Sequence, residues 1–136
     1  MSMDQSQKES LIRLFQADAR ILSVYLFGSR ARGEATAESD FDLAFLTKGP
    51  LTLEEQADLN TKVMMLLGND RVDFTFLTEA PILLRYEILS DGKLLYSSLA
   101  QEAVNAFELS TYREYFHTER FRRLQSESLR EAFSKE

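Results

Sequence analysis

The chain of 136 residues carries 22 acidic and 16 basic side chains, a formal net charge of −6, and it has no cysteine and a single histidine, His117. Disulfides, thiolate zinc sites and Cys-His nucleophile pairs are therefore excluded, and a Ser-His-Asp triad would depend on a histidine in a charged helical tail. The acidic balance argues against nonspecific binding to nucleic-acid phosphates. The remaining chemistry uses carboxylates, hydroxyls and metal ions, and we expect no direct nucleic-acid partner.

Chain length favours one domain over residues 1–136, with a core over about residues 7–97 and a C-terminal helical extension over about residues 98–130. The sequence has no apolar run long enough to span a bilayer and no signal-peptide pattern at its polar, acidic start. We therefore expect a cytoplasmic protein without a membrane partner.

The first expected elements are a helix and a strand. The helix covers about residues 7–19, with Ser6 and Glu9 spaced as a capping box before apolar residues at helical intervals. The strand covers residues 21–27 and is rich in β-branched, aromatic and aliphatic residues, as a buried strand requires. We expect the helix to pack over a sheet that contains this strand.

A glycine-serine turn follows the first strand. Gly28 can take a tight turn at no steric cost, and Ser29 can donate to a phosphate oxygen. Backbone amides at the start of a short helix, expected near residues 30–32, would attract negative charge. Arg30 and Arg32 fit a surface role and a phosphate- or partner-binding role equally well.

Two aspartates lie on the next expected strand, over about residues 40–46. Side chains alternate along a strand, so Asp40 and Asp42 share one face while the apolar residues between and after them share the other. Adjacent carboxylates without a counter-charge repel each other, so their natural partner is a hard cation such as Mg²⁺. Ser39, just before the pair, either caps the turn or contacts a substrate.

A third carboxylate follows farther along the chain. A helix over about residues 53–67, capped by Thr52 and Glu55, leads to a strand over residues 71–77. Alternation places Asp73 on the face opposite to its apolar neighbours. Three carboxylates are therefore expected to converge on one side of a small sheet.

The remaining elements complete an α/β pattern. Thr78 is expected to cap a helix with Pro81 in its first turn, and a short strand over residues 93–96 precedes one long helix that opens near Ser98. The long helix interleaves arginines with aromatic residues, which predict a mixture of core and partner surface. These residues are Tyr112, Tyr115, Phe116, Arg120, Phe121, Arg122 and Arg123.

The combination of turn, gap and aspartate pair resembles a known signature. Gly28-Ser29, ten intervening residues and Asp40-x-Asp42, within the string GSRARGEATAESDFDL, resemble the DNA polymerase-beta-type nucleotidyltransferase superfamily. The fuller string is similar to its smallest members, the minimal nucleotidyltransferases (MNT), which are often antitoxin partners of HEPN-type RNase toxins. Asp73 stands where this family places its third metal-binding carboxylate. The resemblance covers roughly residues 20–97.

The resemblance implies a small mixed sheet of about four strands flanked by helices, with a long C-terminal helix. It implies that Asp40, Asp42 and Asp73 are catalytic and bind two Mg²⁺ ions, one holding a triphosphate and one activating the attacking hydroxyl. With no spare histidine, Asp73 is also the natural general base or the ligand that orients the acceptor. The expected nucleotide-binding residues are Gly28, Ser29, Arg30 and Ser39.

The resulting hypothesis is a Mg²⁺-dependent antitoxin that transfers AMP from ATP to a tyrosine of a partner HEPN RNase toxin, and so neutralises it. The long C-terminal helix is the candidate docking surface for that partner. Two alternatives remain open at this point. One is an antitoxin that neutralises by binding alone, and the other is a small-molecule nucleotidyltransferase similar to aminoglycoside-modifying enzymes.

Overall fold

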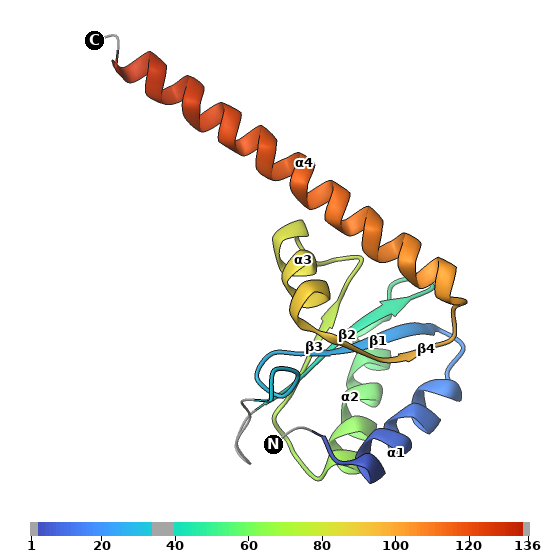
Figure 1. The fold of residues 1–136 in the computed structure, drawn as a ribbon. Helices are drawn as coiled ribbons and strands as arrows, with labels where there is room; N and C mark the ends of the chain where they lie inside the picture. The colour runs from blue at the N-terminus through green and yellow to red at the C-terminus, as the bar shows by residue number, and fades with distance from the viewer. Residues whose placement is uncertain (1–2, 34–39, 135–136) are drawn as a thin grey trace.

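A four-stranded mixed sheet with helices on both faces forms the body of the protein, and one long helix projects from it (Figure 1). The computed structural model describes residues 3–33 and 40–134. In chain order the elements are α1 (Gln5–Gln16), β1 (Ile21–Phe27), β2 (Phe41–Thr47), α2 (Leu53–Leu67), β3 (Val72–Phe76), α3 (Ile82–Asp91), β4 (Lys93–Ser97) and α4 (Gln101–Ser134). The expected α/β class and the long C-terminal helix are confirmed.

The strand order is β3-β2-β1-β4, and the pairing of β2 with β3 is parallel whereas the other two pairings are antiparallel. Phe27 at the end of β1 pairs with Asp42 near the start of β2, and Asp42 pairs in turn with Asp73 of β3. One end of the sheet therefore gathers the end of β1 and the beginnings of β2 and β3.

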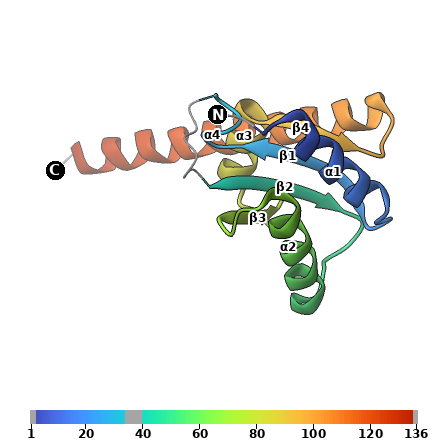
Figure 2. The ribbon, with the colours of Figure 1, turned by 90° about the horizontal axis from the view of Figure 1, so that it is seen from below.

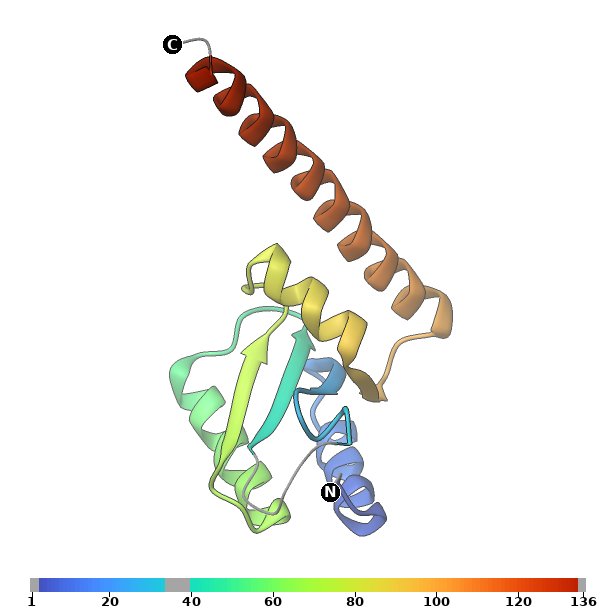
Figure 3. The ribbon, with the colours of Figure 1, turned by 60° about the vertical axis from the view of Figure 1, so that its left-hand side comes forward.

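Two apolar clusters cover the two faces of the sheet. On one face, α1 and α2 contribute Leu11, Phe15 and Val63 to a cluster that includes Phe41 and Phe45 of β2. On the other face, α3 and the first part of α4 pack against the sheet, and Figures 2 and 3 show these two pairs of helices on opposite sides of it. Alternation along β2 consequently points Asp42 away from the α1/α2 cluster, toward the face that α3 covers.

The observed bounds of α2 are the expected ones, because the residues that begin and end this helix lie next to it in the sequence. Thr52 and Glu55 form a reciprocal capping box, and Gly68 closes the helix in the left-handed region at φ +62°. The first helix differs: Asp4 and Gln7 form its capping box, so it begins earlier than the Ser6 and Glu9 spacing predicts.

Three further local expectations are wrong. Residues 29–33 form a turn, not the short helix expected near 30–32. Pro81 is the N-cap of α3 in an extended conformation, so the helix starts at Ile82, after Thr78 has already been used in the preceding turn. The long helix begins at Gln101 because Ser97 Oγ accepts a hydrogen bond from the Leu99 amide, which keeps the intervening residues in a bend.

Within the described ranges, no helix has both the length and the apolar character required to cross a membrane.

Candidate active site

Asp42 and Asp73 occupy neighbouring positions on parallel strands, and Asp40 lies just before β2. Burial raises the pKa of the Asp42 carboxyl, and repulsion from Asp73 and then Asp40 raises it further. Asp73 and Asp40 are therefore both within electrostatic reach of Asp42, which lies on the face that α3 covers. They do not yet form a closed cage: across residues 3–33 and 40–134, no three acidic, imidazole or thiol side chains stand at metal-holding distances.

Gly28 lies against the carboxylate of Asp42. Its φ of +76° is in the region that favours glycine, and a Cβ built on it would overlap Asp42 Oδ2 and lie 3.2 Å from Cγ. The amides of Ala31 and Arg32 both donate to the Gly28 carbonyl at 3.2 Å, which folds the chain into a compact turn with Ser29 half-buried inside it. The turn thus brings its backbone into close contact with an aspartate carboxylate.

These residues fit a divalent cation. The donor set is entirely oxygen, as Mg²⁺ prefers, and the pKa of Asp42 is raised by burial first and then by repulsion from Asp73 and Asp40. A bound cation would relieve that repulsion and favour the ionised form. The missing Cβ at Gly28 is what allows the Asp42 carboxylate to lie against the turn.

The two arginines of the turn have different surroundings. Arg30 is 5% exposed, and its guanidinium carbon lies 3.7 Å from the centroid of the Phe41 ring, which belongs to the α1/α2 cluster. The structure thus packs Arg30 away from Asp42, and its assignment to nucleotide binding stays a prediction. Ser39 lies outside the described residues, so its predicted role is untested as well.

Arg32 is the arginine whose charge acts on the carboxylates, since it opposes the rise in the Asp42 pKa that burial, Asp73 and Asp40 cause. Its Nη1 lies 4.0 Å from Oδ2 of Asp91, the last residue of α3. The sequence alone does not distinguish Arg32 from Arg30, because the alternating Arg-x-Arg pattern does not reveal which arginine packs on Phe41. Phe41, the residue between Asp40 and Asp42, is the one sequence feature that could have distinguished Arg30 from Arg32.

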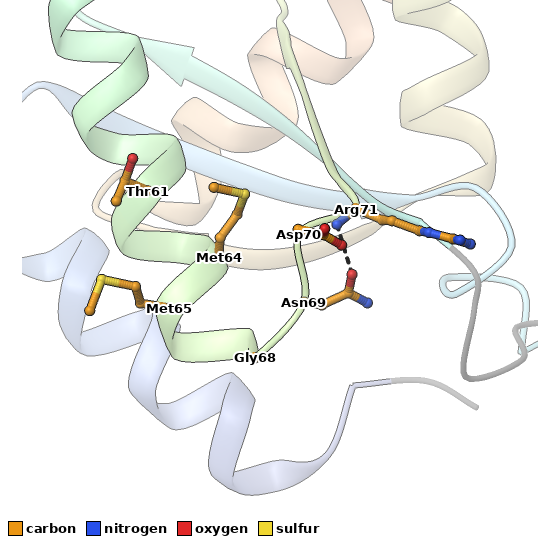
Figure 4. Close-up of a pocket in the computed structure, with 7 residues that line it drawn as sticks. All are labelled: Thr61, Met64, Met65, Gly68, Asn69, Asp70 and Arg71. Atoms are coloured by element: carbon orange, nitrogen blue, oxygen red, sulfur yellow. Dashed lines mark hydrogen bonds between the residues drawn. The ribbon is translucent and has the colours of Figure 1, made fainter.

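An open pocket borders this end of the sheet at the C-terminal end of α2 (Figure 4). The Arg71 amide donates to Asn69 Oδ1 at 2.7 Å, and the Arg71 carbonyl accepts from the Phe41 amide at 2.8 Å. Figure 4 shows the Arg71 side chain directed away from Thr61 and Met65 on α2. The pocket holds none of the three aspartates; its lining residues are Thr61, Met64, Met65, Gly68, Asn69, Asp70 and Arg71.

The sequence and the fold are similar to those of known nucleotidyltransferases. The family model described as polymerase beta, nucleotidyltransferase matches residues 9–101. The protein adenylyltransferase MntA of Shewanella oneidensis is 28% identical over 116 residues, which cover 85% of this chain and 81% of that protein.

Two solved structures agree in fold over most of the chain. A crystal structure of a toxin-antitoxin with AMP-PNP superposes with a TM-score of 0.75 at 26% identity, covering 90% of this chain and 97% of the matched one. A tri-AMPylated Shewanella oneidensis HEPN toxin in complex with MNT antitoxin gives a TM-score of 0.72 at 25% identity, with 93% and 98% covered. Because the family model matches more than half of the sequence, this chain belongs to the polymerase beta nucleotidyltransferase family.

Proposed function

We propose that this protein is a Mg²⁺-dependent protein adenylyltransferase that acts as an antitoxin, transferring AMP from ATP to a tyrosine hydroxyl of a partner HEPN RNase toxin. The observation that carries the proposal is the placement of Asp42 beside Asp73, with the Gly28 turn against its carboxylate. The similarity to MntA and to the AMPylated toxin complex supports AMP as the transferred group and a HEPN toxin as the acceptor.

In this proposal the three aspartates hold the metal, and the turn at Gly28 and Ser29 receives the phosphates. Mg²⁺, when bound, would supply positive charge for the triphosphate and lower the pKa of the attacking hydroxyl. The tyrosine oxygen bonds to the α-phosphorus, the bond from that phosphorus to the bridging oxygen breaks, and pyrophosphate leaves. Asp73 orients the acceptor and takes the hydroxyl proton.

The docking surface proposed for the toxin is the projecting part of α4. The first part of the helix is anchored to the body: Tyr25 Oη donates to Glu108 Oε1 at 2.8 Å, and Tyr115 stacks on Tyr86 of α3 with centroids 3.8 Å apart. From Glu119 to Phe133 every residue is exposed, and Figure 1 shows this part extending away from the sheet. The aromatic residues are therefore divided: Tyr112, Tyr115 and Phe116 contact Tyr86 of α3, whereas Phe121 and Phe133 are exposed.

Large apolar side chains lie on this projecting part, and exposed apolar patches of this kind mark partner surfaces. Arginine, which is enriched at binding hot spots, is interleaved with them. The side chains that define the proposed surface are Phe116, Arg120, Phe121, Arg122, Arg123, Leu124, Leu129 and Phe133.

The test is to incubate the protein with α-labelled ATP, Mg²⁺ and the HEPN toxin encoded beside its gene. Label on the toxin that is lost in Asp40→Asn and Asp42→Asn, and kept in the exposed control Asp58→Asn, supports transfer. Equal neutralisation of the toxin by the two inactive variants, without label, would instead support inhibition by binding alone. Label on an aminoglycoside but not on the toxin would support a small-molecule enzyme.

A further inference from the structure

β3 is an edge strand of the sheet. Among the described residues it pairs only with β2, and Figure 3 shows it beyond that strand. The Arg71 carbonyl, just before β3, accepts from the Phe41 amide at 2.8 Å, and the Leu77 amide, just after it, donates to the Phe45 carbonyl at 2.9 Å. Since every second residue of a parallel strand bonds to its neighbour, the odd-numbered residues of β3 face β2. The even-numbered residues direct their amides and carbonyls outward.

The outward groups of Phe74 make no hydrogen bond within residues 3–33 and 40–134. The outward carbonyls on either side of it have partners. The Val72 carbonyl accepts from Asn60 Nδ2 at 3.5 Å, and the Phe76 carbonyl accepts from the Glu79 amide at 3.1 Å. Unpaired backbone groups on an edge strand are a template for an additional strand. Such a strand would pass directly beside the aspartate that precedes Phe74.

That aspartate, Asp73, lies on the same face of the sheet as Asp42 and is exposed, whereas Val72 before it is buried. A residue opposite Asp73 on an added strand would direct its side chain to this face. The backbone of Asp73 bonds to β2, so an antiparallel neighbour would form a non-hydrogen-bonded pair with it, with Cα atoms about 4.5 Å apart. A tyrosine at that position would carry its hydroxyl to the side of the sheet where the carboxylates lie.

The pocket at the end of α2 lies where an added strand would pass the beginning of β3 (Figure 4). One of its lining residues, Arg71, is two positions before Asp73. Met64 and Met65 supply apolar surface to it, and Met65 is 78% exposed. Methionine adapts to apolar side chains of different shapes. The pocket is therefore placed to receive an apolar side chain a few residues from the tyrosine.

The strand order separates the side of the acceptor from the side of the nucleotide. The Gly28 turn, which receives the phosphates in the proposed function, follows β1, and β2 lies between β1 and β3. Asp73, which takes the proton of the attacking hydroxyl, is on β3. The acceptor therefore approaches along β3. A protein acceptor can use the open edge, because it brings a backbone of its own.

We propose that the tyrosine-bearing segment of the toxin binds as an added strand along the outer edge of β3, with an apolar side chain near the tyrosine in the pocket at the end of α2. This inference rests on the proposed function and adds to it the acceptor site on this chain. The acceptor site is separate from the docking surface on α4, which holds the body of the toxin.

Steady-state transfer of AMP from ATP to the full-length toxin tests the pocket. Met65→Asp places a charge among its apolar side chains and creates no cavity, because Met65 is exposed. We expect the KM for the toxin to rise about tenfold or more, with an unchanged kcat and unchanged binding of AMP-PNP with Mg²⁺. Leu53→Asp, at the other end of α2, is the matched control and should leave all three quantities unchanged, since Leu53 is 83% exposed and outside the pocket.

Hydrogen exchange resolved to single amides by NMR tests the edge of β3. The toxin is added at saturating concentration with Mg²⁺ and the α,β-methylene analogue of ATP, which cannot transfer AMP. The Phe74 amide should then exchange about tenfold or more slowly than without toxin, because it gains a hydrogen bond. The Thr75 amide, which faces β2, and the outward amides of β4 at the opposite edge should keep their rates.

Three results would overturn the proposal. An unchanged KM for the toxin in Met65→Asp would show that the acceptor does not use the pocket. Weaker AMP-PNP binding by the same variant would assign the pocket to the nucleotide. Unchanged exchange of the Phe74 amide in the complex would show that the acceptor does not pair with β3. In all three cases the unmodified protein still labels the toxin, whereas a toxin that takes no label would overturn the proposed function itself.

Discussion

Gly28 packs so closely against Asp42 that no side chain fits between the turn after β1 and the first carboxylate of β2. The contact joins the phosphate-binding part of the proposed site to its metal-binding part. It also depends on two separate properties of glycine: the positive φ and the absence of a Cβ. These properties can be separated experimentally.

Gly28→Ala and Gly33→Ala form a matched pair. Both glycines have φ near +75°, at +76° and +75°, but among described atoms nothing lies within 4 Å of a Cβ on Gly33. Each substitution should lower the free energy of unfolding by about 1–2 kcal/mol through backbone strain. Gly28→Ala should in addition displace the Asp42 carboxylate and lower AMP transfer by roughly 100-fold.

Denaturant unfolding and a transfer assay check this pair. Equal transfer by the two variants would show that contact with Asp42 is unimportant and that only backbone strain distinguishes glycine at position 28.

Asp42→Asn should stabilise the metal-free protein at neutral pH while abolishing transfer. Burial, Asp73 and Asp40 raise the pKa of Asp42 above its ordinary value of 3.8, so the folded protein binds this proton more tightly than the unfolded chain does. Stability associated with this group is therefore present at low pH and is lost as pH rises above 3.8. The gain from Asp42→Asn should be visible at pH 7 and disappear below the ordinary pKa.

Unfolding curves recorded with chelator between roughly pH 3 and pH 8 measure this gain. This range covers the pH values over which a carboxyl with a raised pKa loses its proton. Asp58→Asn should change stability by less than about 0.5 kcal/mol throughout, because it removes only an exposed pair. A lower stability of Asp42→Asn at pH 7 would contradict the repulsion described here.

Mg²⁺ with AMP-PNP should raise the melting temperature of the unmodified protein. Ligand present at about 100 times its dissociation constant adds about 2.7 kcal/mol, which corresponds to several degrees for a domain of this size. Asp42→Asn and Asp73→Asn should lose most of this shift, whereas Asp58→Asn should keep it. A full shift in the two site variants, measured by differential scanning fluorimetry, would place the metal and nucleotide elsewhere.

Charged substitutions on the projecting part of α4 should weaken binding to the toxin without unfolding the protein. Phe121 and Leu124 are 58% and 52% exposed, so Phe121→Asp and Leu124→Asp remove apolar contact area without creating a cavity. Each should weaken the complex by about 2 kcal/mol if it is a binding hot spot, or about 30-fold. Leu53→Asp on α2, where Leu53 is 83% exposed, is the control.

Surface plasmon resonance with the toxin immobilised measures these affinities. Unchanged affinity of both α4 variants would mean that the partner docks on a different surface.

Strands and helix bounds could be predicted from local sequence patterns wherever only one such pattern was present. The bounds of α2 could be predicted because Thr52, Glu55 and Gly68 act within one turn of the helix ends. At α1 two overlapping capping patterns exist, and the structure uses the one in which Asp4 and Gln7 form the capping box. The sequence predicts Pro81 in the first turn of a helix capped by Thr78, but Pro81 is itself the N-cap of α3; both positions tolerate a residue without an amide proton.

The carboxylates could be predicted because alternation along a strand is a purely local rule, and the structure places Asp42 and Asp73 as neighbours on one face. The arginines could not be predicted in this way. Which of Arg30 and Arg32 turns toward the site depends on the Phe41 ring and on Asp91, which lies about sixty residues away in the chain. Contacts between distant segments leave no periodic signal in the sequence.

We propose that Asp40, Asp42 and Asp73 carry the transfer of AMP to a tyrosine of the HEPN toxin. The most direct test is mass spectrometry of the toxin after co-expression with this protein, followed by tandem sequencing of the modified peptide. We predict that the toxin gains one or more AMP groups on tyrosine, and that the added mass disappears with Asp42→Asn. A toxin that is neutralised by the unmodified protein yet retains its unmodified mass would contradict the claim.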